Sequence, residues 1–190
     1  MDALDLLRAD HNRLRGLSAR FGAAHEAGDL ALMGALAGRI GEEIEMHTAI
    51  EEEHFYPAVR RADRRIAEAL DASLQEHHVV KLLLGEIRDL QPGELMWAAK
   101  LSVLIDSVQH HMAEEERELF PEARQALDRA ARLRLASALE RRKAALGAPV
   151  GSDREGLSCE QVHELARVQQ IPGRSKMTSA ELRATIDPRG

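Results

Sequence analysis

The stretch from 47 to 57 reads HTAIEEEHFYP, and the stretch from 111 to 121 reads HMAEEERELFP. In each stretch a His is followed four residues later by a Glu, and a Pro comes six residues after that Glu. Residues four apart on a helix lie one turn apart on the same face, so the imidazole and the carboxylate can reach the same metal ion. The two stretches therefore predict helices that each carry a pair of metal ligands.

The repeat extends upstream of both stretches. Asp10-His11 lies 36 residues before His47, and Glu76-His77 lies 34 residues before His111. Two copies of a two-helix unit bring four helices together, and bundle cores hold metal sites made of facing side chains. The sequence therefore predicts an all-α fold, an up-down-up-down four-helix bundle whose core contains four His and two Glu.

These polar residues interrupt the apolar stripe of each predicted helix. The stripes, read at three- and four-residue steps, are Leu4, Leu7, His11, Leu14, Ser18, Phe21; Met33, Leu36, Ile40, Ile44, His47, Glu51, His54; Ile66, Leu70, Leu74, His77, Val80, Leu84, Ile87; and Trp97, Leu101, Leu104, Val108, His111, Glu115, Leu119. A buried carboxylate is costly unless it is paired or coordinates a metal. Imidazole and carboxylate together suit iron, manganese or zinc, and six ligands exceed what one tetrahedral ion takes, so two ions are expected.

Other histidines lack this pattern. His78 and His110 adjoin predicted ligands, but the apolar steps lead from His77 to Val80 and Leu84, and only His111 has a Glu four residues later. We expect His25, at a helix end, and His163, in the tail, to be solvated.

The chain resembles the bacterial hemerythrin-like proteins with the HHE cation-binding domain, over residues 1 to about 145. The matching motifs are Asp10-His11, His47-x-x-x-Glu51 with Phe55-Tyr56-Pro57, Glu76-His77, and His111-x-x-x-Glu115 with Leu119-Phe120-Pro121. The resemblance implies a non-haem di-iron centre, oxo- or hydroxo-bridged, in which carboxylates bridge the irons and imidazoles cap them. The ligands that it implies are His11, His47, Glu51, His77, His111 and Glu115.

One position departs from the oxygen-carrying hemerythrins, which have a second His one turn further along the third helix. Here the residue four after His77 is Lys81, so one iron would have an open position or a water ligand. This difference makes reversible O2 carriage doubtful and favours redox chemistry on a small oxidant. Three further residues are candidates for hydrogen-bond partners of the ligands or for alternative ligands: His54, Tyr56 and Glu118. Glu118 takes the position of His54 in the second repeat. For His54 we favour the hydrogen-bonding role.

Three functional classes follow from this site. The first is an enzyme with catalase-like peroxide disproportionation or another reaction with peroxide or O2. The second is a module that binds or senses iron, O2 or nitric oxide without turnover. The third is a DNA-associated stress protein in which the bundle is structural.

Composition limits the setting. The 190 residues have a net charge of −6, 44% hydrophobic and 3% aromatic content, which suits one helical core plus an appendage. The N-terminus does not read as a secretion signal, and no apolar run is long enough for a membrane span. The single Cys159 rules out an intramolecular disulfide, and we expect a cytoplasmic protein.

Helix boundaries can be predicted from local signals. We expect breaks at Gly28-Asp29, with Asp29 as an N-cap, at Arg61-Ala62-Asp63 and at Gln91-Pro92-Gly93. Pro57 and Pro121 should bend or end their helices. A fifth amphipathic helix is expected at about 128 to 145, with an Arg-rich solvated face.

The C-terminal part of the chain differs in character. We divide the chain into a bundle at 1–146, a linker at 147–156 and a small two-helix module at 157–190, with capping boxes at 158–161 and 178–181. The module resembles the N-terminal module of the transcription terminator Rho and the SAP-like tail of bacterial Ku, which implies a possible nucleic-acid partner. Residues 151–190 hold six Lys or Arg and six Asp or Glu, so they lack the net positive charge that phosphate binding needs, and a docking appendage is favoured.

Overall fold

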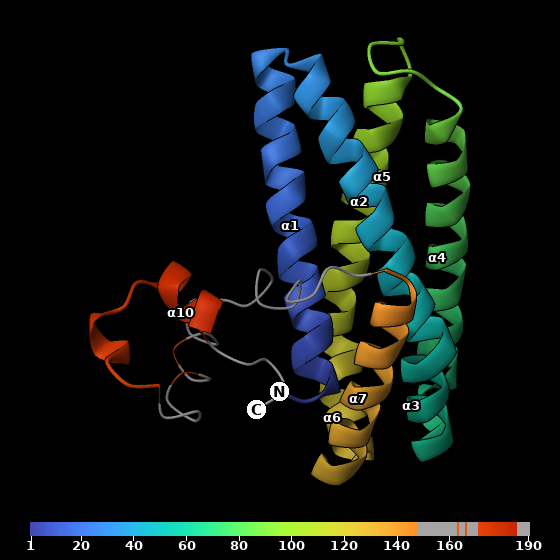
Figure 1. Cartoon of the computed structure of the whole chain (residues 1–190). Coiled ribbons are helices and arrows are strands. Elements are labelled where there is room, and N and C mark those ends of the chain that lie inside the picture. Colours follow the sequence, from blue (N-terminus) through green and yellow to red (C-terminus); the bar gives the residue numbers. More distant parts are fainter. Residues whose placement is uncertain (148–162, 164–165, 167–170, 186–190) are drawn as a thin grey trace. The chain divides into compact units, whose positions relative to one another are not determined.

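The structure, a computed structural model, describes residues 1–147, 163, 166 and 171–185. The described part is all helical, which confirms the predicted fold class (Figure 1). Its elements are α1 (Ala3–Ala27), α2 (Leu30–Ile50), η1 (Glu51–Phe55), α3 (Tyr56–Ala62), η2 (Arg64–Ile66), α4 (Ala67–Arg88), α5 (Trp97–Glu114), η3 (Glu115–Leu119), α6 (Phe120–Ala126), α7 (Arg129–Ala145), η4 (Arg174–Lys176) and α10 (Ser179–Thr185). The predicted linker after Gly147, Cys159 and the capping box at 158–161 lie outside the described residues.

The chain divides into two compact units, one of residues 14–128 and one of residues 1–13 with 129–190. In the first unit, α2, α4, α5 and the part of α1 from Leu14 onward run side by side as a four-helix bundle (Figure 1). Their inward faces form one apolar core that extends from Leu14 to Met112 and includes Phe21, Ile40 and Trp97. Burial of this apolar surface is the main term that stabilises the bundle.

The predicted break between the first two helices is confirmed. Gly28 has a φ of 68°, a left-handed conformation that Gly adopts without steric cost, and it ends α1. Asp29 then caps α2, since its carboxylate accepts a hydrogen bond from the backbone N–H of Leu32 at 2.9 Å. The predicted breaks near Ala62 and Pro92 also separate helices in the structure.

The second unit contains a buried charge cluster. The Asp10 carboxylate accepts hydrogen bonds from Arg13 and, at 2.7 Å, from Lys143 of α7. All three side chains are buried, and their pairing offsets part of the cost of burying these charges. Lys143 therefore differs from the solvated face that the sequence predicts for the fifth helix.

The last helix begins as its capping box predicts. The side chain of Glu181 accepts a hydrogen bond from the backbone N–H of Thr178 at 2.7 Å, and the Thr178 hydroxyl accepts one from the N–H of Glu181 at 3.3 Å. Ala166, Ile171 and Leu182 belong to one small buried apolar cluster. The domain boundaries at 146 and 157 stay a prediction.

None of the helices in the described part of the chain combines the length and the apolar character that crossing a membrane needs.

Candidate metal centre

Each repeated motif contains a π-helical turn that starts at its Glu. In η1 the backbone N–H of Tyr56 donates to the carbonyl of Glu51, and in η3 the N–H of Phe120 donates to the carbonyl of Glu115. The next residue is Pro in both cases; it has no N–H, and its ring crowds the carbonyl four residues earlier. The wider turn lets the chain stay helical through the Pro. π turns of this kind often occur at functional sites.

All six predicted ligands are buried. Their exposed fractions run from 0% to 5%, in the order His11, Glu51, His77, Glu115, His47 and His111. The adjacent histidines His78 and His110 are exposed. The helical register inferred from the apolar stripes is therefore the observed one.

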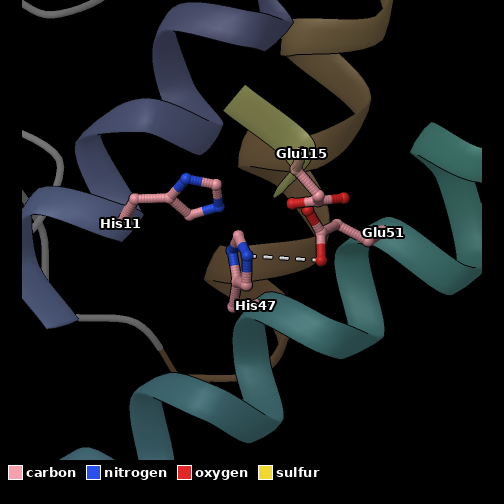
Figure 2. A group of neighbouring side chains, drawn as sticks. All are labelled: His11, His47, Glu51 and Glu115. Carbon is pink, nitrogen blue, oxygen red and sulfur yellow. Dashed lines mark ion pairs between the residues drawn. The ribbon is translucent and has the colours of Figure 1, made fainter. Parts of the chain in front are cut away.

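The six residues form two groups that share Glu51. In the first group, one donor atom from each of His11, His47, Glu51 and Glu115 lies within 4.8 Å of the others. Figure 2 shows these four side chains pointing toward a common centre, His11 from α1 and His47 from α2. The second group is Glu51, His77 and His111, which meet the same 4.8 Å limit. As metal ligands, the six residues remain a prediction.

The imidazoles present their Nε2 atoms to the carboxylates. The Nε2 atoms of His47 and His77 lie 3.2 Å and 3.5 Å from Oε2 of Glu51. Nε2 of His111 lies 3.7 Å from Oε2 of Glu115 and 3.0 Å from Nε2 of His77. Nitrogen and oxygen donors therefore converge on a small volume.

Two further carboxylates fix the orientation of two rings. Glu52 lies 2.9 Å from Nδ1 of His77, and Glu76 lies 2.7 Å from Nδ1 of His111. An ionised carboxylate only accepts hydrogen bonds, so each Nδ1 donates and each Nε2 of a neutral ring directs a lone pair inward. The Nε2 atoms of His77 and His111 lie 3.0 Å apart, close enough for both to donate to one cation.

The protonation state of His77 suits metal binding. Burial, and then the nearby His111, lower the pKa of His77 to about 4. The ring is therefore neutral at pH 7, the form that can donate a lone pair to a metal. The hydrogen bond from His111 lowers the pKa of Glu76, so this carboxylate is ionised as well.

Tyr56 also reaches the centre. Its buried hydroxyl donates to Oε1 of Glu115 at 3.0 Å and lies 3.2 Å from Nε2 of His77. Burial, followed by the charges of Glu51 and Glu115, raises the pKa of Tyr56 well above 10, so the phenol keeps its proton. It therefore acts as a hydrogen-bond donor to a proposed ligand, one of the two roles the sequence leaves open for it.

The other two candidates lie differently. His54 is half-buried and belongs to neither donor group, and Glu118 is exposed and pairs with Arg117 at 2.8 Å. Sequence reasoning did not assign Glu52 or Glu76 a contact with a ligand. Glu76 was noted only as the acid next to His77, although it is His111 on the facing helix that it contacts.

The donor set fits a pair of transition-metal ions. Neutral imidazoles and ionised carboxylates are the ligands that iron and manganese prefer, and a carboxylate common to both groups can bridge two ions. A cavity of about 150 Å³ is lined by His111 and Glu115 together with the small side chains of Ala69, Ala72 and Ser73 of α4. His111 is the member of the second donor group that lines this cavity.

Comparison with known proteins agrees with this geometry. Residues 2–123 match the family model described as the hemerythrin HHE cation binding domain. A protein named DNA nickase from Nostoc sp. (strain PCC 7120 / SAG 25.82 / UTEX 2576) is 29% identical over 122 residues, which cover 63% of this chain and 33% of that protein. The chain thus spans about a third of the length of this relative. No solved structure matches the chain.

Proposed function

The chain belongs to the hemerythrin HHE cation-binding family, and from that premise we propose that it binds two non-haem iron ions and reacts with a small oxidant, either hydrogen peroxide or O2. One observation carries the proposal. Glu51 is a member of both donor groups, and each group contributes two imidazoles besides it. A carboxylate placed in this way could contact an ion held by either group.

The proposed ligands are divided between the ions by these groups. His11, His47 and Glu115 would hold one ion, His77 and His111 would hold the other, and Glu51 would contact both. A bound iron pair supplies one-electron redox steps and a coordination position for a small oxidant. The replacement of a family ligand by Lys81 is consistent with an open coordination position on one iron. The Lys81 ammonium faces Glu52, at 2.6 Å and 2.8 Å from the two carboxylate oxygens, and not the donor groups.

The surrounding side chains prepare the site for this chemistry. Burial of all six donors excludes bulk water and strengthens electrostatic interactions there. Tyr56 holds the Glu115 carboxylate in place through its hydroxyl proton. A cavity beside His111 and Glu115 offers room for a small oxidant next to the proposed ligands.

The test begins with metal loading. The protein is loaded with ferrous iron without oxygen, its iron is measured by mass spectrometry, and its absorption spectrum is recorded after exposure to air. For the wild type we expect about two irons per chain and the charge-transfer bands of a ferric pair. His111→Ala should lose iron. The matched control His110→Ala changes the exposed neighbouring histidine and should keep its iron. Iron content that is near zero in the wild type, or equal in the two variants, contradicts the proposal.

Turnover separates the enzyme from the sensor. Steady release of O2 from hydrogen peroxide by the iron-loaded protein supports catalase-like disproportionation. Iron that is oxidised once and releases no O2 supports a binding or sensing module for iron, O2 or nitric oxide.

The relative named DNA nickase makes a DNA-associated role the alternative of a different class. Residues 151–190 carry equal numbers of basic and acidic residues, six of each, which gives little electrostatic attraction to phosphate. DNA binding that weakens with salt and disappears on deletion of residues 150–190 would support this alternative.

A further inference from the structure

A surface lysine is linked to one proposed ligand through a carboxylate. Nζ of Lys81 lies 2.6 Å from Oε1 and 2.8 Å from Oε2 of Glu52, and Oε1 of Glu52 lies 2.9 Å from Nδ1 of His77. All three residues belong to the unit of residues 14–128. Lys81, Glu52 and His77 therefore form a continuous chain of charge-assisted hydrogen bonds that runs from the half-exposed ammonium to the metal centre.

The partner histidine is supported differently. His111 donates from Nδ1 to Glu76 at 2.7 Å. Within the described part of the chain, no Lys or Arg side chain forms an ion pair with Glu76. An ionised carboxylate behind an imidazole increases the electron density at its other nitrogen. An ammonium on that carboxylate offsets this effect. His77 is therefore expected to donate more weakly to a metal than His111.

The internal repeat contains the same kind of pair at the corresponding place. Arg15 follows His11 by four residues, as Lys81 follows His77, and Glu116 follows Glu115 as Glu52 follows Glu51. A nitrogen of the Arg15 guanidinium lies 2.9 Å from Oε1 of Glu116. In both pairs, the cation lies one turn after a proposed ligand His of one repeat, and it binds the acid that follows the proposed ligand Glu of the other repeat.

We propose that Lys81 is a positioning residue of the metal centre, which holds Glu52 against His77 and moderates how strongly that imidazole donates to its metal. The moderating part rests on the proposed function, and the positioning part does not. Lys81 occupies the position of a family ligand, but its role is to act on a ligand through Glu52.

The positioning role is tested without metal. Nitrogen-15 NMR of ¹⁵N-histidine-labelled protein reports which ring nitrogen carries the proton, and a His77→Gln spectrum assigns the signal among the nine histidines. In the wild type we expect the ring of His77 to carry its proton on Nδ1 only. Lys81→Met should give a mixture of tautomers, Lys81→Arg should restore the single one, and Lys100→Met, which breaks a lysine pair with Glu86 elsewhere on the bundle, should have no effect.

The moderating role is tested on the iron-loaded protein by spectroelectrochemistry. A metal on Nε2 would leave the proton of His77 on Nδ1 with or without Lys81, so Glu52 would keep its hydrogen bond to this ring in the iron-loaded protein. Loss of the ammonium would then increase donation from His77 and stabilise the ferric state, so Lys81→Met should shift the reduction potential downward. The shift should be absent in Lys81→Arg and Lys100→Met. It should also diminish at high salt, because the Lys81 side chain is 44% exposed and its charge is screened.

The possible outcomes separate the claims. An unchanged His77 tautomer in Lys81→Met overturns the positioning role. A changed tautomer with an unchanged or raised potential overturns the moderating role. A wild-type protein that takes up no iron refutes the proposed function, while the NMR experiment still decides the positioning role.

Discussion

The two repeated motifs share a backbone and differ in their hydrogen bonds. Both place a His four residues before a buried Glu, both begin a π turn at that Glu, and both continue as a helix through a Pro. The first motif has Tyr56 just before its Pro, with a hydroxyl that contacts the centre, and the second has Phe120 at the same place. The duplication thus preserves the positions of the donors, while the side chains around them have diverged.

The divergence extends to the glutamates themselves. Glu51 belongs to both donor groups, whereas Glu115 belongs to one and receives the Tyr56 hydroxyl. Two halves with matching backbones therefore give an asymmetric site. The same substitution made at matching positions of the two motifs should therefore change iron content or stability by unequal amounts.

The largest predicted effect compares the two glutamates. Glu51→Ala removes a donor from both groups and should reduce the iron content from about two per chain to near zero. Glu115→Ala leaves Glu51, His77 and His111 in place and should retain about one. Metal analysis of the purified variants is the measurement, and Glu53→Ala, an exposed acid in the same π turn as Glu51, is the control. Equal losses in Glu51→Ala and Glu115→Ala would show that the halves are equivalent.

The next effect is the stabilisation that the metal provides. A ligand that binds only the folded state stabilises it by about 2.7 kcal/mol at a concentration 100 times its Kd. Because two ions are proposed, ferrous iron at that excess over both Kd values should raise the free energy of unfolding of the wild type by about 5 kcal/mol, which is about 2.7 kcal/mol for each ion. Urea denaturation without oxygen is the measurement. The same addition should leave Glu51→Ala unchanged. Stabilisation of that variant to the wild-type extent would place the iron elsewhere.

The sequence predicted the fold well because apolar periodicity is a local signal. Of the residues in the four apolar stripes, the structure buries all but Ser18, His54 and Leu74, which are half-buried. Exposure of His78 and His110 follows the same periodicity. The π turns were not predicted, because a Pro in a helix indicates a disturbance without saying whether the chain bends, ends or widens.

The contacts around the candidate site were less predictable. A buried His or Glu on an apolar stripe can be recognised from spacing, so the six donors could be proposed from sequence. Glu52 and Glu76 flank the stripes, and their contacts with His77 and His111 run between different helices. Contacts between helices depend on packing that one sequence does not specify, so the contact of Lys81 with Glu52 could not be predicted from the sequence.

A smaller effect follows from making the motifs alike. Tyr56→Phe gives the first motif the residue that the second already has and removes the hydrogen bond to Glu115. Loss of a buried hydrogen bond costs about 1 kcal/mol, and more where an acceptor loses its partner. Iron content should stay at the wild-type value, because Tyr56 is a donor of hydrogen bonds and its phenol is protonated. Urea denaturation and metal analysis measure the two quantities, and loss of iron would make Tyr56 a ligand.

The smallest effect concerns the surface pair of Arg15 with Glu116 of the second motif. Arg15 and Glu116 are 36% and 28% exposed, so water and salt screen their attraction, and Arg15→Met should lower the free energy of unfolding by about 0.5 kcal/mol. Urea denaturation at low and high salt is the measurement, and the difference from wild type should shrink as salt increases. A loss above about 2 kcal/mol that salt does not change would mean that this pair is part of a buried network. The repeat would then use its second acid–cation pair for stability and its first, Lys81 with Glu52, for the metal centre.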